Sequence, residues 1–342
     1  MGVTLSVLDQ SPVPSGSSPA DAVGETLTLA REAERLGYRR YWLAEHHGSA
    51  ALAGSAPEVL VARVASATSS IRVGAGGVLL THYSPLKVAE TFRLLHALFP
   101  GRIDLGIGRT AGTDDPATTA ALQQSPGRGE ADRFADQVAD VVGFLHATLE
   151  EPHPFAGVRA MPEGAGAPEV WLLGSSSPSA AYAAELGLRF CFAHFITPFA
   201  GPQVVASYRR SFRPSAQLAE PKASVAVAVV CADTDAEAER LASSYRLARV
   251  RPGGSDAGPI PSVDEAEAYP YTELQLALLA QDRPRVIVGA PDRARDRMLA
   301  LAERFGVDEL VVVTVCHDPK ARLRSYTLLA DAFGLGPGPR PA

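Results

Sequence analysis

The chain has 342 residues, of which 46% are hydrophobic and 20% are charged, and its formal net charge is -6. This composition is typical of a folded chain with a large core and argues against disorder. The acidic balance and the lack of a basic run argue against a nucleic-acid partner, and no apolar run reaches the roughly 20 residues of a membrane span.

The three cysteines, Cys191, Cys231 and Cys316, lie far apart in apolar, strand-like surroundings. Their odd number and the lack of a CxxC or zinc spacing favour buried free thiols over a disulfide framework. The N-terminus also lacks the basic region and long apolar core of a signal peptide. We therefore expect a cytoplasmic protein.

Apolar, strand-like runs alternate with helix-like segments along the chain. The expected strands are Val3–Leu8, Arg40–Leu43, Ile71–Ala75, Ile103–Ile107, Val170–Leu173, Phe190–Ala193, Ser224–Val230 and Leu310–Val315. Several are apolar throughout, as expected of strands that are covered on both faces. Eight such strands with helices between them predict an α/β fold, a single (β/α)8 TIM barrel over residues 1–336 with a flexible Gly/Pro-rich tail at 337–342.

Two long segments interrupt this alternation. Thr110–Gly127 follows the fourth strand, and Arg251–Pro284, rich in Pro, Gly and acidic residues, lies between the seventh and eighth strands. Long segments after barrel strands often build the substrate pocket. We expect this of Thr110–Gly127, whereas for Arg251–Pro284 a pocket element and a disordered surface insertion both remain open.

The second strand ends in Glu45-His46-His47. Histidine is a favoured proton carrier because its unperturbed pKa lies nearest neutrality, and barrels keep their acid/base groups at the carboxyl ends of strands. Adjacent strand residues point to opposite faces, so at least one histidine is expected to be structural. For the same reason the three side chains cannot all converge on one ion, and we expect no metal site.

The third and fourth strands end in groups suited to a flat, phosphorylated ligand. Gly76 and Gly77 allow a ligand to approach the backbone closely, although a bulge in a buried strand would also explain them. Arg109 ends the fourth strand, where its cation would meet either a phosphate or a carboxylate at the rim.

The fifth strand leads through Gly174-Ser175-Ser176 directly into a helix that starts near Pro178. Free backbone N–H groups, hydroxyls and the positive end of a helix dipole make an anion site, and helix capping by Ser177 is compatible with it. Together with the preceding strand ends, this pattern predicts a planar, phosphorylated cofactor.

In order and spacing the motifs resemble those of the bacterial-luciferase-like flavin-dependent monooxygenases. The matching segments are Leu8-Asp9-Gln10-Ser11-Pro12, Ala44-Glu45-His46-His47, Val73–Leu80, Gly101–Arg109 and Leu173-Gly174-Ser175-Ser176. Within the family the chain is similar to the subgroup found in secondary-metabolite and antibiotic biosynthesis, whose substrates are often aromatic polyketides.

The resemblance implies a monooxygenase that binds reduced FMN (FMNH2), reacts with O2 through a flavin hydroperoxide and oxidises a small organic substrate such as an aromatic polyketide. It also implies a homodimer and a separate NAD(P)H-dependent flavin reductase, because the chain carries no convincing dinucleotide motif. The residues leave hydroxylation, epoxidation and Baeyer–Villiger insertion open. A deazaflavin-dependent oxidoreductase and a non-catalytic flavin-binding relative are the alternatives on the same barrel.

Carried over residue by residue, the resemblance assigns His46 to proton transfer beside the flavin and Gly76–Gly77 to a non-prolyl cis peptide under its ring. Arg109 would bind the phosphate. The same role is implied for Gly174, Ser175 and Ser176.

Three further residues are candidates for substrate contact. His194 and Phe195 follow the sixth strand and are expected to shape a pocket wall, although His194 is equally consistent with a rim position. His82 lies in the loop after the third strand, where it would contact either substrate or solvent.

Overall fold

The structure is a computed structural model that describes residues 2–122, 130–164 and 166–336. Its strands are β1 (Thr4–Asp9), β2 (Arg40–Leu43), β3 (Arg72–Leu79), β4 (Ile103–Gly108), β5 (Glu169–Gly174), β6 (Arg189–Ala193), β7 (Ala223–Cys231), β8 (Val286–Gly289) and β9 (Glu309–Val313). All pairings between them are parallel. The expected tail at 337–342 lies outside the described residues.

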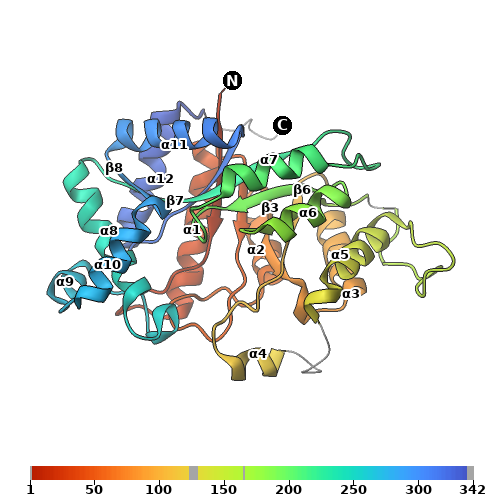
Figure 1. Cartoon of the computed structure of the whole chain (residues 1–342), viewed down its shortest axis with the longest axis horizontal. Helices are drawn as coiled ribbons and strands as arrows, with labels where there is room; N and C mark the ends of the chain where they lie inside the picture. Colours follow the sequence, from red (N-terminus) through yellow and green to blue (C-terminus); the bar gives the residue numbers. More distant parts are fainter. Residues whose placement is uncertain (1, 123–129, 165, 337–342) are drawn as a thin grey trace.

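Eight of these strands close into a barrel in the order β1-β2-β3-β4-β5-β6-β7-β9, with β9 pairing back onto β1. Figure 1 shows helices packed around the strands. The predicted (β/α)8 fold is therefore confirmed. The surrounding helices are α1 (Pro19–Leu36), α2 (Pro57–Ala67), α3 (Pro85–Leu98), α4 (Pro116–Leu122), α5 (Glu130–His146), α6 (Ser177–Glu185), α7 (Gly201–Ser211), α8 (Asp235–Val250), α9 (Val263–Ala268), α10 (Glu273–Asp282), α11 (Pro291–Phe305) and α12 (Pro319–Phe333). Of the described helices, none is long and apolar enough to cross a membrane.

Strand β8 was not predicted and is not part of the barrel. It pairs with Ala228–Cys231 at the carboxyl end of β7, beyond the residues of β7 that pair with β6. The preceding insertion is ordered into α9 and α10, so within the described residues it is not a disordered loop. The barrel strand expected at Leu310–Val315 is thus β9.

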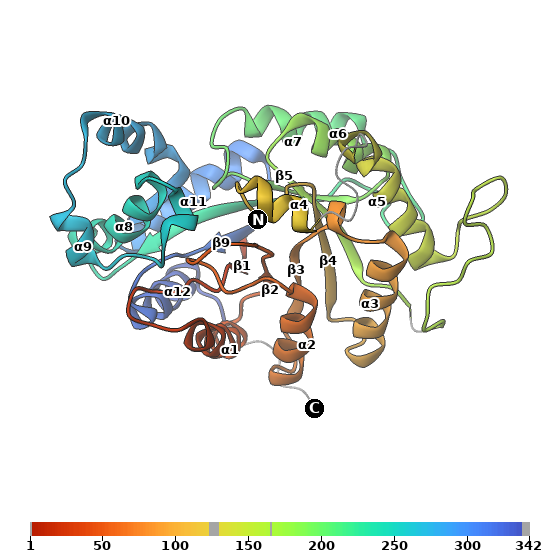
Figure 2. The same cartoon turned by 90° about the horizontal axis from the view of Figure 1, so that it is seen from below.

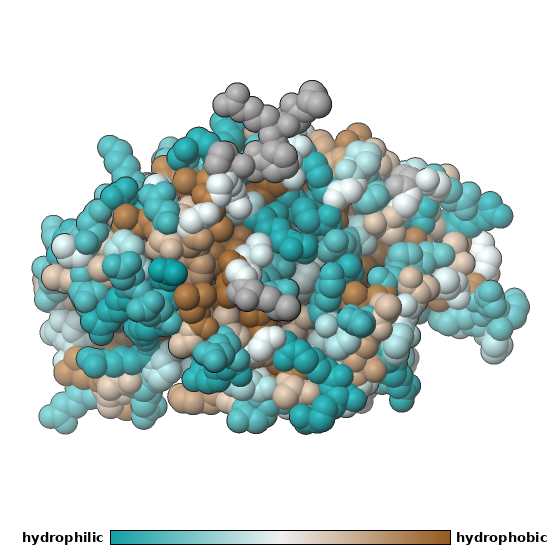
Figure 3. Space-filling view, turned by 90° about the horizontal axis from the view of Figure 1, so that it is seen from above, coloured by the Kyte–Doolittle hydropathy of each residue, from teal (hydrophilic) through white to brown (hydrophobic). Residues whose placement is uncertain are grey.

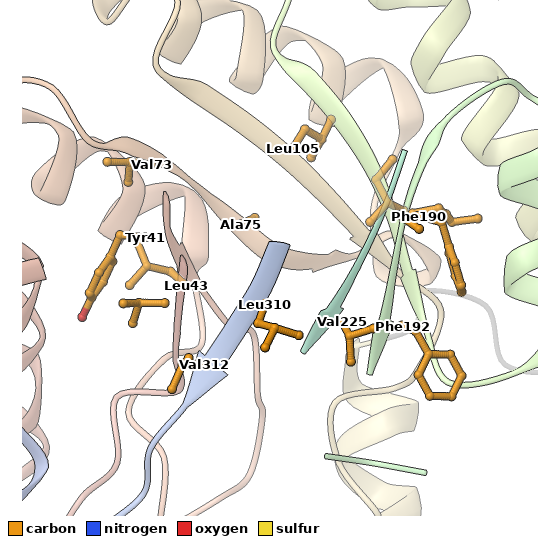
Figure 4. Close-up of a cluster of buried hydrophobic side chains, with 14 of the residues drawn as sticks. Tyr41, Leu43, Val73, Ala75, Leu105, Phe190, Phe192, Val225, Leu310 and Val312 are labelled. Atoms are coloured by element: carbon orange, nitrogen blue, oxygen red, sulfur yellow. The ribbon is translucent and has the colours of Figure 1, made fainter. Parts of the chain in front are cut away.

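Side chains alternate between two apolar layers along each strand. Those that face outward, such as Tyr41 and Leu43, pack between the strands and the helices (Figure 4). Those that face inward, such as Leu8, Trp42 and Trp171, fill the inside of the barrel. This alternation decides which strand-end residues face the inside of the barrel.

The end of the barrel where the strands begin is closed by buried charges. Arg40 is 2% exposed and pairs with Asp104 (2.8 Å), Glu309 (2.8 Å) and Glu169 (3.1 Å). Trp42 donates its Nε1–H to Asp104 (2.9 Å) from above this cluster. On the outside of this end, hydrophilic and hydrophobic residues are intermixed (Figure 3). The cluster leaves the opposite end of the barrel open for a site.

Candidate functional site

A cavity of about 830 Å³, including its open mouth, lies at the carboxyl ends of the strands. This is the end from which Figure 2 views the barrel, with α4 of the expected pocket insertion in the foreground. The predicted site residues that line it are His46, Gly76, Gly77, Arg109, Gly174, Ser175 and Phe195. Its volume lies in the range of ordinary small-molecule and cofactor sites. The structure thus brings most of the predicted residues to one cavity.

His46 presents a neutral imidazole to this cavity. Its backbone N–H donates to the carbonyl of Gly54 (2.8 Å), which fixes the segment after β2. Its ring Nδ1 is buried and has no hydrogen-bond partner among the described residues. Burial, chiefly, and the nearby charge of His47 lower the pKa of His46 to about 4. At neutral pH the ring is therefore uncharged and able to accept a proton.

Glu45 also lines the cavity, and it forms a hydrogen-bonded cluster with His47. One carboxylate oxygen of Glu45 lies 2.8 Å from Nε2 of His47 and accepts a hydrogen bond from the hydroxyl of Tyr83 (2.6 Å). The other accepts from the backbone N–H of Leu79 (2.9 Å). Burial and the contact with Glu45 raise the pKa of Tyr83. The cluster thus ties the segment after β2 to the end of β3 and to Tyr83. In the described part of the chain, no group of side chains is suited to bind a metal ion.

Arg109 and the start of α6 form the part of the cavity suited to an anion. The guanidinium of Arg109 has no carboxylate or hydrogen-bond partner within residues 2–122, 130–164 and 166–336. The N-cap of α6 is Ser176, one residue before the expected Ser177, and its side chain makes no capping bond. Ser176 does not line the cavity, because its hydroxyl turns toward that of Ser179 (3.4 Å). An unpaired cation beside a helix N-terminus fits a phosphate.

The Gly76–Gly77 peptide bond is cis, as the resemblance implied. The register between β3 and β4 also shifts at this point, so the bulge that we kept as the alternative is present as well. A Cβ on Gly76 would lie 2.7 Å from Leu8 Cδ1 and 2.8 Å from Trp42 Cβ. A Cβ on Gly77 would lie 2.7 Å from the carbonyl oxygen of Gly106. Close packing of neighbouring strands therefore requires both glycines, whatever the cavity holds.

Of the candidates for substrate contact, only Phe195 lines the cavity. His194 is 2% exposed, and its Nε2 lies 3.1 Å from the carbonyl oxygen of Pro284. His82 lies beside the cluster of Glu45, with its Nε2 3.0 Å from the carbonyl oxygen of Ala111. The structure places both histidines outside the cavity lining.

Two cavity residues, Gln10 and Cys191, were not singled out from the sequence. Gln10 stands two residues after the inward-facing Leu8, so the period of two along β1 was the pattern that could have identified it. Cys191 faces the barrel interior from β6, and burial raises the pKa of its thiol to about 12. All three cysteines are free and buried, as predicted.

Residues 1–309 match the family model described as luciferase-like monooxygenase. The protein YwcH of Bacillus subtilis is 44% identical over 97% of this chain and 99% of its own length. The N-acetyl-S-alkylcysteine monooxygenase of the same bacterium is 36% identical over 96% of this chain and 98% of its own length. The structure of apo-MsnO8 superposes with a TM-score of 0.90 at 44% identity and covers 98% of this chain and 100% of that one.

More distant solved structures share the fold alone. A 3,6-diketocamphane monooxygenase from Pseudomonas putida, solved with FMN, has a TM-score of 0.68 at 21% identity. An F420-dependent secondary alcohol dehydrogenase has a TM-score of 0.65 at 14% identity. The same barrel therefore carries both flavin and deazaflavin chemistry in other proteins.

Proposed function

Because the chain belongs to the luciferase-like monooxygenase family, we propose that it oxidises a small organic substrate with O2 and reduced FMN. The observation that carries this proposal is that Arg109, whose guanidinium has no partner among the described residues, lines the same cavity as His46. A phosphorylated cofactor with a reactive ring fits such a pair of groups. When bound, reduced FMN would supply the two electrons with which O2 gives one oxygen atom to the substrate and one to water.

The residues of the chain would bind this cofactor and control protons around it. Arg109 and the backbone at Gly174 and Ser175 would hold the phosphate through charge and the dipole of α6. The imidazole of His46 would accept or donate a proton in the cavity, since its lowered pKa keeps it neutral near pH 7. Leu173 and Phe195 on the cavity wall would exclude water from the reacting atoms.

Two partners belong to the proposal. A separate NAD(P)H-dependent flavin reductase would supply FMNH2. A second copy of the chain would form a homodimer through α2 and α3, which expose Val59, Leu94 and Leu98 by 63%, 52% and 61%. Free buried thiols accord with our expectation of a cytoplasmic location.

The cavity favours a neutral or largely apolar substrate. Arg109 is the one Arg or Lys among its described lining residues, and the phosphate would occupy it. Leu8, Trp42, Phe195 and Ile196 supply apolar contacts, which suit an aromatic polyketide. The name of one relative, N-acetyl-S-alkylcysteine monooxygenase, adds a thioether as the second candidate substrate.

A stopped-flow experiment tests the proposal. Anaerobic protein with one equivalent of FMNH2 is mixed with oxygenated buffer, and the absorbance of oxidised FMN and the yield of H2O2 are followed. We expect FMN to return more slowly than in free solution, and more quickly again in a His46→Ala variant. Addition of an oxidisable aromatic ketone or S-alkyl-N-acetylcysteine should then lower the H2O2 yield.

Reoxidation at the rate of free FMNH2, with full H2O2 yield on every substrate, would contradict the monooxygenase. Tight binding of reduced F420 in place of FMNH2 would favour the deazaflavin-dependent oxidoreductase instead. Slow reoxidation without any oxidised product would favour the non-catalytic flavin-binding relative.

A further inference from the structure

Gln10 is a half-buried polar side chain that lines the cavity. It follows β1 directly and lines the cavity on the same face of the chain as Leu8. Its amide group makes no hydrogen bond to any residue that the structure describes. A polar group that lines a cavity and has no partner among the described side chains can bind a polar group of a ligand there.

The backbone on both sides of Gln10 is rigidly held. The carboxylate of Asp9 is fully buried and accepts hydrogen bonds from the backbone N–H of Ser11 (2.7 Å), the hydroxyl of Tyr41 (2.5 Å) and the guanidinium of Arg322 (2.6 Å). Ser11 has a positive φ of 50°, and its carbonyl accepts from the backbone N–H of Ala53 (2.9 Å). Several contacts from distant parts of the chain therefore hold Gln10 in its place at the cavity wall.

The barrel places Gln10 across the cavity from the anion site. In the strand order β1-β2-β3-β4-β5-β6-β7-β9, β1 lies four strands from β5 in either direction. Arg109 directly follows β4 and Gly174 ends β5, so a ligand held there by its phosphate would extend across the cavity toward β1. The Gln10 amide, which lies opposite the anion site, is neutral and offers a hydrogen-bond donor and an acceptor side by side.

We propose that Gln10 recognises the imide edge of the flavin ring, an inference that rests on the proposed function. An imide presents an N–H beside a carbonyl, and the glutamine amide is its complement, since its carbonyl accepts and its NH2 donates. Gln10 is thus a positioning residue that sets the ring within the cavity, while Arg109 sets the phosphate. A substrate amide offers the same chemistry, and the test separates the two.

The test measures binding of oxidised FMN, and of 3-methyl-FMN, by flavin fluorescence without turnover. Methylation of the imide nitrogen removes the donor that Gln10 would receive. We expect the wild-type protein to bind FMN about tenfold more tightly than 3-methyl-FMN. A Gln10→Met variant, which is nearly isosteric, should bind FMN about tenfold more weakly and lose the preference.

Two further variants complete the design. Gln217→Met makes the same exchange at an exposed position outside the cavity lining, and it should behave as the wild type. Gln10→Glu keeps the size and an acceptor but loses the donor, and it should also bind FMN more weakly; it replaces Gln10→Met if that variant fails to fold by circular dichroism.

The outcomes are distinguishable. Wild-type affinity for FMN in a folded Gln10→Met or Gln10→Glu variant, or a retained preference against 3-methyl-FMN, would overturn the flavin contact alone, and would assign the free amide to substrate. No binding of FMN by the wild-type protein would overturn the proposed function and this inference with it.

Discussion

The stability of the protein should depend on pH through His46. In the folded chain the pKa of this residue is about 4, against an ordinary value of 6.5, because burial and His47 disfavour the charged ring. Between these two pH values the unfolded chain carries a proton on His46 that the native chain does not. Acid therefore draws the equilibrium toward the unfolded state, and stability falls as the pH falls from 6.5 toward 4.

The magnitude follows from the two pKa values. Above pH 7 both states are neutral at His46, and the residue contributes no pH dependence. At pH 5 the difference in proton binding costs the native state about 2 kcal/mol, and at pH 4 about 3 kcal/mol. These values concern one residue, whereas other histidines with lowered pKa, such as His194, add to the total.

The contribution of His46 is isolated by comparison with His46→Gln. The free energy of unfolding is measured in urea at pH 8, 7, 6 and 5 for both proteins. The advantage of His46→Gln over the wild type should grow by about 2 kcal/mol between pH 8 and pH 5. Parallel pH dependences for the two proteins, or an NMR titration of the His46 ring near its ordinary pKa, would refute the reasoning.

Three further outcomes are expected. Arg109→Ala should weaken FMN binding about 30-fold and Arg109→Lys less so, because paired guanidinium bonds to a phosphate are lost; an unchanged affinity in a fluorescence titration would contradict the assignment. Gly77→Ala should lower the free energy of unfolding in urea by about 1–3 kcal/mol, since its Cβ would meet the carbonyl of Gly106, and a wild-type midpoint would show that the strands can part. Arg40→Met should cost about 3–5 kcal/mol at pH 7, because it leaves the buried carboxylates unpaired, and the loss should shrink in acid; an equal loss at pH 5 would argue against that cause.

The barrel could be predicted because its strands are apolar on both faces and alternate regularly with helices. Strand β8 escaped prediction because it has only four residues, Val286–Gly289, and follows a Pro- and Gly-rich segment that reads as a loop. Capping patterns at Ser262 and Thr272 in that segment did mark the starts of α9 and α10. The second pattern belongs to a short helix that the sequence indicates at Thr272–Ala280 and that α10 confirms, whereas the pattern at Ser262 was not used.

The site was predictable only as far as strand ends define it. His46 lies three residues after β2 and Arg109 directly follows β4, and the fold brings such positions together. His194 and Phe195 follow the end of β6, where alternation no longer fixes direction, and only Phe195 lines the cavity. The ion pair between Asp9 and Arg322 joins residues 313 positions apart, a pairing that no local pattern reveals.

The pairing of β1 with β9 makes the barrel depend on two segments about 300 residues apart in the chain. Until residues 309–313 have left the ribosome, β1 and β7 both lack β9, the strand that lies between them in the barrel. Arg322, which neutralises the buried Asp9, emerges later still. Between the synthesis of β7 and that of β9 a partly formed sheet would therefore present two open edges, at β1 and β7, and open edges favour aggregation.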